Sequence, residues 1–460
     1  MPQMHRRPAL VAIGIAFVSL PVFVALGVAG TGAAAAGSAA PAPPPAPAAV
    51  TLLRCGAIVD VRAGTTRAGG SIVVRGEGIE AVLDAGGAAP AGARVVDLSG
   101  LTCLPGLIDA HTHVFLQPGD YDTQLLKWSQ PRRTLTAAAA AREMLLAGFT
   151  TIRDLETEGA MYADVDLRDA IEAGIIPGPR MQVATRAIST TGNYALLGYA
   201  PEVSVPKGVQ IADGADGMRR AVREQIQYGA DWIKFYGDYR TFRDSGEIVD
   251  LRVTMTGEEM NALVDEATRR HRPVSAHCYA DEAARQAVRA GVRSIEHGMF
   301  LDETTLSMMK EKGVVYCPTL TAYRTSYDEN PTDAWKAIAD AHRETFKRAM
   351  RLGVTIACGS DAGSFAHREA GRELTLMAEY GMSAKDVLRA ATVVNADLLG
   401  WKERIGEIAA GRLADIIAVD GDPLRAIEAV RRVRFVMKGG AVFNPEAAAP
   451  PAPETGSADR

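Results

Sequence analysis

The sequence predicts an α/β fold: a (β/α)8 TIM barrel with a small β-sandwich domain that both flanks of the chain build. The first observation behind this is size, because 460 residues with 47% hydrophobic and 23% charged side chains suit a large barrel plus a satellite domain. The second is a unit that recurs between residues 104 and 400. In each unit a helical pattern ends near a glycine and a short β-branched run follows, which indicates βαβ units with parallel strands.

Eight strands are expected in this region, and eight such units favour a closed barrel over an open sheet. Leu146-Ala147-Gly148 before Phe149 is one example of the junction between helix and strand. Helix starts are marked by capping-box spacing, as in Thr256 with Glu259 and Ser383 with Asp386. The expected strands begin near residues 104, 149, 180, 231, 273, 293, 314 and 354.

The two segments that flank this region have a different sequence pattern. Residues 51–103 and 401–444 carry short apolar runs separated by glycine turns, such as Gly69-Gly70 and Gly439-Gly440. We therefore predict that these two segments form the β-sandwich and that residues 104–400 form the barrel.

The N-terminus resembles a secretion signal over residues 1–36. A basic start precedes the apolar stretch Ala9 to Gly30, and a small-residue run offers cleavage after Ala36. Export to the periplasm or outside the cell is expected, and membrane contact only if this segment stays uncleaved. Residues 37–50 and 445–460 are rich in alanine and proline, as in a linker and a disordered tail.

Charge and cysteine content exclude some classes of protein. The net charge is −5, with no basic stripe, so no nucleic-acid partner is expected. The five cysteines form no C-x-x-C motif, and three lie in apolar strand-like runs, so we expect buried free thiols. They are Cys55, Cys103, Cys278, Cys317 and Cys358.

Histidines at the ends of predicted strands indicate a metal site. Because alternate strand residues point the same way, His111 and His113 are expected to project together. Functional residues of barrel enzymes lie at the carboxyl ends of strands, and His277, His297 and Asp361 share that register. These side chains therefore predict a transition-metal centre.

Lys234 suggests a second metal ion. It lies in the apolar run Asp231 to Tyr236, where a buried ammonium needs a partner or a chemical modification. Desolvation lowers the pKa of such a lysine, and the neutral amine can react with carbon dioxide. The resulting carbamate would be an anionic ligand able to bridge two cations.

Taken together, the motifs resemble those of the amidohydrolase superfamily, binuclear subtype, over residues 51–444. The chain is most similar to the imidazolonepropionase-related branch of Xaa-Pro dipeptidase-like and carboxypeptidase-like peptidases, which includes ochratoxin-type amidases. Several relatives carry Gly-Gly-His where this chain has Thr191 to Tyr194, so no role is carried over for that histidine. The matching stretches are Leu104 to His113, Asp213 to Arg240, Ser275 to His277, Ser294 to Gly298, Gly359 to Ala362 and Gly406 to Asp415.

The resemblance implies a ligand set and a reaction. His111, His113 and Asp361 would hold one metal and His277 and His297 the other, with carboxylated Lys234 and a hydroxide as bridges. Zinc is the expected ion. The hydroxide would attack a C-terminal amide of dipeptides or N-acyl-amino acids. Asp361 would then pass the proton to the leaving nitrogen.

Substrate contacts are assigned to residues after strands 3 and 4. Tyr239, Arg240 and Tyr194 are the candidates for binding a substrate carboxylate. His271 and His342 are expected at the surface or at helix caps. The expected partners are a small-molecule amide or dipeptide substrate and further copies of the chain in a homo-oligomer.

Two alternatives remain. One is a mononuclear deaminase or imidazolonepropionase-like cyclic amide hydrolase, against which Lys234 argues. The other is a lactonase or esterase on the same scaffold, since a metal-activated hydroxide does not select the leaving group.

Overall fold

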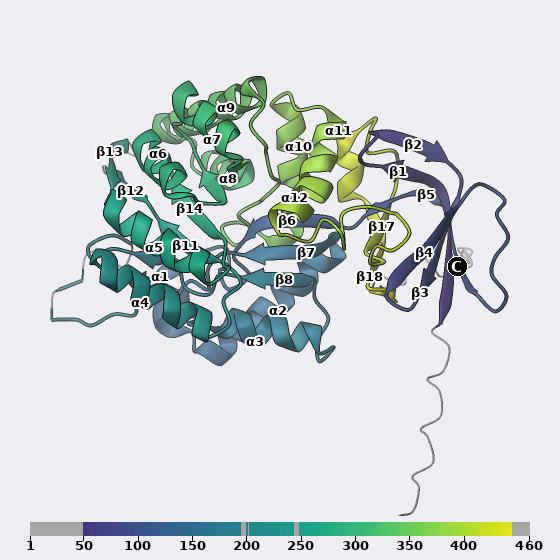
Figure 1. Cartoon of the computed structure of the whole chain (residues 1–460), viewed down its shortest axis with the longest axis horizontal. Coiled ribbons are helices and arrows are strands. Elements are labelled where there is room, and N and C mark those ends of the chain that lie inside the picture. The colour runs from purple at the N-terminus through teal and green to yellow at the C-terminus, as the bar shows by residue number, and fades with distance from the viewer. Residues whose placement is uncertain (1–48, 195–198, 201, 243–247, 444–460) are drawn as a thin grey trace, which may run out of the picture. The chain divides into compact units, whose positions relative to one another are not determined.

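The computed structural model describes residues 49–194, 199–200, 202–242 and 248–443, with the backbone alone for residues 240–242 and 248–250 (Figure 1). The predicted secretion signal (1–36), nearly all of the linker (37–50) and the tail (445–460) lie outside the described residues. No helix among the described residues is long and apolar enough to span a membrane.

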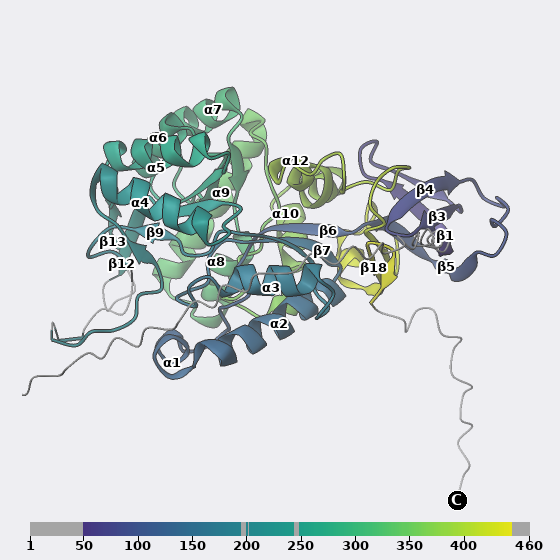
Figure 2. The same ribbon diagram turned by 60° about the horizontal axis from the view of Figure 1, so that its bottom comes forward.

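Both flanks of the chain join one eight-stranded sheet, and in Figures 1 and 2 their purple and yellow strands lie side by side. The strand order is β19-β18-β17-β5-β1-β3-β4, with β2 paired to β1. Since the pairings describe one sheet, the sandwich and the domain boundaries stay predictions. The strands are β1 (Val50–Asp60), β2 (Thr65–Ala68), β3 (Ser71–Arg75), β4 (Gly78–Leu83), β5 (Arg94–Pro105), β17 (Ile416–Val419), β18 (Val433–Lys438) and β19 (Ala441–Val442).

The central region has the predicted parallel strands in two sheets. One sheet has the order β6-β7-β8, and the other has the order β10-β9-β11-β14-β15-β16. Every pairing within these two sheets is parallel, which confirms the mixed α/β class. The strands are β6 (Leu107–Thr112), β7 (Phe149–Asp154), β8 (Arg180–Val183), β9 (Ile188–Ser189), β10 (Gln210–Ile211), β11 (Ile233–Tyr236), β14 (Val274–Cys278), β15 (Ser294–His297) and β16 (Val315–Cys317).

Backbone hydrogen bonds link these sheets at both edges. The amides of Asp231 and Trp232 donate to the carbonyl of Val183 at the end of β8. At the other edge, Tyr316 forms a parallel bridge with Ile356, and the amide of Ala110 donates to the carbonyl of Cys358. The segment 354–358 thus lies between β16 and β6.

Two of the expected strands differ from the prediction. The strand predicted near residue 104 begins at Leu107, because Gly106 separates it from β5. A Cβ at Gly106 would lie 2.1 Å from the hydroxyl of Thr150, so only glycine allows this close crossing. The strand predicted near residue 354 is present only as isolated parallel bridges, of Ile356 with Tyr316 and of Ala362 with Thr112. The amide of Asp361 also donates to the carbonyl of His111, so the segment runs beside β6 without the continuous pairing of a strand.

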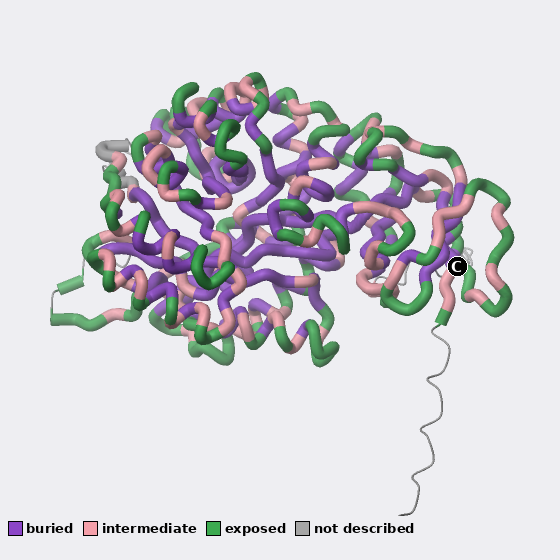
Figure 3. The backbone as a smooth tube through the Cα atoms, viewed as in Figure 1, coloured by how far each residue is buried: buried purple, intermediate pink, exposed green. Residues whose placement is uncertain are grey.

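Helices follow most of the strands, and Figure 3 shows buried strands with exposed residues on the surrounding helices. The predicted capping box of Thr256 and Glu259 is present at α5, and the hydroxyl of Ser383 accepts a hydrogen bond from the Asp386 amide at α11. The helices are α1 (Tyr121–Lys127), α2 (Gln130–Leu146), α3 (Ala163–Glu172), α4 (Gly214–Gln227), α5 (Gly257–Arg269), α6 (Asp281–Ala290), α7 (Glu303–Lys312), α8 (Leu320–Glu329), α9 (Asp333–Leu352), α10 (Arg372–Glu379), α11 (Ala384–Arg389) and α12 (Asn395–Leu398), with the short turns His367–Glu369, Ala390–Val394 and Ile427–Arg431.

An antiparallel hairpin, which was not predicted from the sequence, follows β11. It consists of β12 (Asp238–Phe242) and β13 (Ile248–Val253). The hairpin places Tyr239 and Arg240 beyond the carboxyl end of β11.

The expectation of five free thiols is wrong for two cysteines. Cys55 and Cys103 form a disulfide between β1 and β5, with their Cα atoms 6.0 Å apart. These strands pair in parallel, and a register shift after Cys55 brings the two residues together although 48 positions separate them. Cys278, Cys317 and Cys358 are buried and free, as expected.

Candidate metal centre

The predicted ligands His111, His113 and Asp361 meet at the carboxyl ends of the central strands. The Nε2 atoms of the two histidines are 3.2 Å apart. Asp361 Oδ1 lies 3.4 Å from His111 Nε2 and 3.1 Å from His113 Nε2. Three ligand atoms therefore surround one point, as a metal ion requires.

The second predicted pair lies beside this trio. His277 on β14 and His297 on β15 have ring centroids 4.4 Å apart, and the His297 ring is 4.9 Å from that of His111. Ligand atoms of His111, His297 and Asp361 all lie within 4.8 Å of one another. The chain therefore provides nitrogen and oxygen donors for two adjacent ions, which is the donor set that catalytic zinc takes.

Lys234 reaches the same region from β11. Its side chain is buried, and its Nζ lies 5.6 Å from the centroid of the Tyr236 ring. Burial lowers the pKa of Lys234, although the carboxylates of Glu296, Glu156 and Asp361 oppose this effect. A buried amine with a lowered pKa is the reactant that carboxylation by carbon dioxide needs.

The backbone is strained at three points of the centre. His297, Thr319 and Asp361 have φ values of 69°, 55° and 61°, in the left-handed region that non-glycine residues rarely adopt. The hydroxyl of Thr319 lies 2.8 Å from Nδ1 of His297. Such strain persists where the surrounding structure fixes it, and it is concentrated at functional sites.

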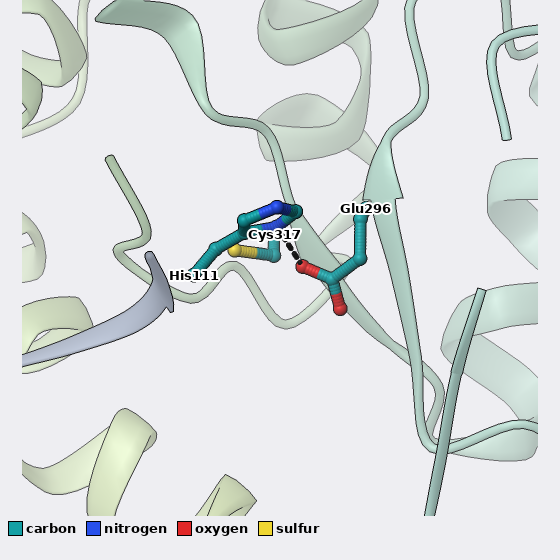
Figure 4. Close-up of side chains that lie close together, drawn as sticks. All are labelled: His111, Glu296 and Cys317. Carbon is teal, nitrogen blue, oxygen red and sulfur yellow. Dashed lines mark hydrogen bonds and ion pairs between the residues drawn. The ribbon is translucent and has the colours of Figure 1, made fainter. Parts of the chain in front are cut away.

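Glu296, which was not among the residues predicted from the sequence, supports the centre. Its carboxylate lies 2.8 Å from Nδ1 of His111 (Figure 4). It also accepts a hydrogen bond of 2.9 Å from Arg153. A partner at Nδ1 fixes the ring and leaves Nε2 facing His113 and Asp361. The available indication was an acidic residue inside an otherwise uncharged strand, Ser294 to His297.

Cys317 lies next to this hydrogen bond but is not a suitable anionic ligand. Figure 4 shows its sulfur beside His111 and Glu296. Burial raises the pKa of the Cys317 thiol well above its usual value, and the carboxylate of Glu296 raises it further. The thiol is therefore neutral. Glu296 and Cys317 pack against His111 on the side away from His113 and Asp361 and do not form a separate ion site with it.

Protonation states suit the binding of cations. Burial, together with the charge of Lys234, lowers the pKa of His111 to about 4, so that its ring is neutral. Burial raises the pKa of Asp361, but His111 and His113 lower it to about 2. Burial also disfavours protonation of His113, but Asp361 raises its pKa to about 9, which marks a position that favours positive charge.

The centre opens into a cavity of about 480 Å³. Tyr194 and Tyr239, two of the predicted substrate contacts, line this cavity, whereas the side chain of Arg240 lies outside the described residues. The hydroxyl of Tyr194 donates to the carboxylate of Glu158, so its proton is directed at the protein. Four further tyrosines line the cavity: Tyr121, Tyr236, Tyr279 and Tyr323.

The remaining predicted histidines divide into one exposed and one buried residue. His271 is exposed, as expected. His342 was expected at the surface or at a helix cap, and this prediction is wrong. It is 2% exposed and packs edge-on against Tyr323 at a distance of 5.3 Å between the ring centroids. The reason is that its face of α9 turns inward, with Ile338, Thr345 and Phe346 also buried. His367, six residues beyond Asp361, lies with Nε2 3.2 Å from the carbonyl of the proposed ligand His113.

Comparisons with known proteins agree on one family. The model of the Amidohydrolase family matches residues 102–443. Ochratoxinase from Aspergillus niger is 31% identical over 373 residues, covering 74% of this chain and 75% of its own length. A solved Xaa-Pro dipeptidase with bound methionine matches with a TM-score of 0.80 and 30% identity, over 86% of this chain and 100% of that chain. A prolidase in complex with N-methylphosphonate-L-proline matches with a TM-score of 0.78 and 29% identity, over 86% of this chain and 99% of that one.

Proposed function

This chain belongs to the amidohydrolase family, and from that premise we propose that it cleaves a C-terminal amide bond of dipeptides or N-acyl-amino acids. Membership confirms the resemblance to the peptidase-like branch, and the chain is a metal-dependent hydrolase acting on amide bonds. The observation that carries the proposal is the meeting of His111, His113 and Asp361, with His277 and His297 beside them, at one open cavity.

In this proposal two divalent ions, zinc by default, occupy the centre. His111, His113 and Asp361 would hold one ion and His277 and His297 the other, with Lys234 as a bridging N6-carboxylysine. The ions supply Lewis acidity that polarises the amide carbonyl and lowers the pKa of water. Asp361, ionised at neutral pH, accepts a proton from water and delivers it to the leaving nitrogen.

We interpret the two parallel sheets as one closed (β/α)8 barrel. The hydrogen bonds from Asp231 and Trp232 to Val183 at one edge, and the contacts of the segment 354–358 at the other, support this interpretation. In such a barrel the carboxyl ends of the strands form the active face, where all the proposed ligands lie.

We further propose that the protein is exported to the periplasm or beyond. The disulfide between Cys55 and Cys103 supports this, because disulfides persist in oxidising compartments. Mass spectrometry of the protein secreted by a bacterial host is expected to show an N-terminus at Gly37. A mature chain that retains the apolar segment 9–30 would contradict cleavage and indicate a membrane anchor.

A hydrolysis screen tests the proposed reaction. Dipeptides and N-acyl-amino acids that vary at the C-terminal residue are incubated with the purified protein, and the released amino acid is measured. Cleavage by the native protein, and none by Asp361→Asn, is the expected result. Turnover of lactones, esters or aminopurines without cleavage of any C-terminal amide would favour the alternative activities instead.

A further inference from the structure

A buried carboxylate, Glu158, lines the cavity next to the candidate metal centre. It is 4% exposed. Its Oε2 accepts a hydrogen bond of 2.9 Å from the Tyr121 hydroxyl and a second from the Tyr194 hydroxyl. Its Oε1 lies 3.8 Å from Nδ1 of His113. Among the described residues no lysine or arginine forms an ion pair with this carboxylate, so its charge faces the cavity without a basic partner of that kind.

A second carboxylate, Glu156, adds unmet hydrogen-bonding capacity at the same place. It is fully buried, and its Oε2 accepts a hydrogen bond of 2.7 Å from the Tyr236 hydroxyl. Its Oε1 is buried without a hydrogen-bond partner among the described residues. Ligand atoms of Glu156, Glu158 and His113 lie within 4.8 Å of one another. Burial and the charge of Glu158 raise the pKa of Glu156 well above its usual value, so a cation that arrives with a ligand would relieve an unfavourable pair of carboxyl groups.

Aromatic rings surround these carboxylates. The ring centroid of Tyr194 lies 5.0 Å from that of Tyr236 and 6.4 Å from those of Tyr121 and Tyr239. The faces of tyrosine rings attract ammonium groups, particularly where water is excluded. The wall of the cavity therefore combines negative charge with π faces.

We propose that Glu158, with Tyr121 and Tyr194, binds the protonated amino group on the acyl half of the substrate, so that the enzyme prefers unblocked dipeptides to N-acyl-amino acids. The inference rests on the proposed function and assigns the substrate class within it.

The position of Glu158 relative to the metal centre suits this role. His113 presents Nδ1 to Glu158 and Nε2 to Asp361, so one imidazole ring separates the carboxylate from the centre. In a dipeptide the α-amino nitrogen is two bonds, about 2.5 Å, from the scissile carbonyl carbon. A hydrogen bond of about 2.9 Å from the ammonium extends this reach towards Glu158 while the carbonyl stays at the centre. A neutral N-acyl group at this place could not form an ion pair with Glu158 and would lose that interaction, which costs binding energy.

Matched substrates test the assignment. The ratio of kcat/KM is measured for an alanyl dipeptide and its N-acetyl form, both with the C-terminal residue that is cleaved best. The wild type is expected to prefer the free amine. Glu158→Gln is expected to lower kcat/KM for the free amine by about 10- to 100-fold and to leave the N-acetyl substrate within about twofold. The metal content of the variant should equal that of the wild type.

Two variants serve as controls. Asp122→Asn removes a carboxylate that lines the same cavity but bonds to Tyr199 at 3.0 Å, and it should not change the ratio. Glu158→Asp keeps the charge and moves it back by one methylene, so it should retain part of the preference, and it tests the proposal if the glutamine variant does not fold.

Four outcomes would overturn the assignment. If Glu158→Gln lowers kcat/KM for both substrates to the same extent and also loses metal, Glu158 only positions His113. If the wild type cleaves the N-acetyl form at least as well, or holds three metal ions per chain, no ammonium binds there. An N-acetyl-lysyl substrate could also be cleaved with the same kcat/KM as the substrate with a free α-amine, and lose this activity in Glu158→Gln. In that case the subsite takes a side-chain ammonium, and the assignment to the α-amino group is wrong. Cleavage of neither class would instead contradict the proposed function itself.

Discussion

At the scale of single residues, the centre depends on groups that set the orientation and charge of the proposed ligands. His111 is neutral and is held by Glu296, whose charge is matched by Arg153. Burial raises the pKa of Glu296, but Arg153 and the hydrogen bond to His111 hold it well below its usual value. The result is a fixed imidazole backed by a permanent negative charge, an arrangement that raises the basicity of a metal ligand.

Alternation along a strand sufficed to predict His111 and His113 as neighbours, and register at strand ends predicted His277, His297 and Asp361 beside them. Glu296 could not be predicted, because its role arises from a contact between β15 and β6, 185 positions apart. The same holds for Glu158, because its hydrogen bonds to Tyr121 and Tyr194 join it to the start of α1 and to a loop more than 30 positions away.

Replacement of Lys234 tests the proposed bridge between the metal ions. Lys234→Ala is expected to lose both ions and to lower kcat/KM by at least about 100-fold, because it removes the ligand that is proposed to be shared by both ions. Metal content and hydrolysis are measured together, with Lys310→Ala on the exposed face of α7 as the control. Full turnover by Lys234→Ala would rule out the carboxylated lysine.

Replacement of Glu296 tests the support of His111. Glu296→Gln keeps the shape but leaves Arg153 buried without a charged partner, and should destabilise the fold by about 3–5 kcal/mol. Metal affinity should fall by about 10- to 100-fold, since Nδ1 of His111 loses its anionic partner. Metal titration and urea denaturation measure the two effects. Unchanged metal affinity would show that Glu296 has only a structural role.

At the scale of helices and strands, local sequence rules predicted where helices begin and end better than they predicted an additional hairpin between the expected elements. Glycine ends α6, α7 and α9 in the left-handed conformation, and the capping box at α5 is present. The hairpin of β12 and β13 was missed, because the alternation that marks it is short and follows directly on β11. The bridge at Ile356 shows that a parallel path can form without the regular pairing that defines a strand.

An ion-pair cluster between α4 and α5 should make stability depend on pH. Glu266 accepts two hydrogen bonds of 2.9 Å from Arg223 and one of 2.6 Å from Arg270, which lower its pKa to about 2. A lowered pKa stabilises the fold above the unfolded value of 4.5, and this contribution is lost as pH falls towards 2. Because both arginines are about half exposed, Glu266→Gln should cost only about 1–2 kcal/mol at pH 7.

Urea denaturation at pH 7 and at successively lower pH measures this effect. The difference between wild type and Glu266→Gln should shrink below pH 4.5. Glu344→Gln, which breaks an exposed pair with Lys347, is the matched control and should change stability by less than about 0.5 kcal/mol. A difference for Glu266→Gln that stays constant as the pH falls would contradict the lowered pKa.

At the scale of the whole molecule, the two ends of the chain meet in one sheet. β17 from the C-terminal flank pairs with β5, and Ile416 lies opposite Pro105 just before the first central strand. The similar pattern of short apolar runs and glycine turns in residues 51–103 and 401–444 predicted shared β structure. The order of the strands and the disulfide could not be predicted, because they follow from long-range pairing that no local pattern encodes. The homo-oligomer and the sandwich stay predictions.

Removal of the disulfide should affect stability and spare the centre. The double variant Cys55→Ser, Cys103→Ser should lose about 2–4 kcal/mol of unfolding free energy, because the unfolded chain gains freedom over the 48-residue separation. Metal content and kcat should be unchanged, since both cysteines lie in the sheet of the flanks. Loss of bound metal in a folded double variant would show that this sheet holds the centre in place.

The number of metal ions per chain tests the account most directly. Elemental analysis of the purified wild-type protein, paired with hydrolysis assays before and after chelation, should give two divalent ions per chain. Activity should disappear with the ions and return when zinc is restored. One ion per chain at full activity, or full activity after complete removal of metal, would contradict the two-metal centre built from His111, His113, Lys234, His277, His297 and Asp361.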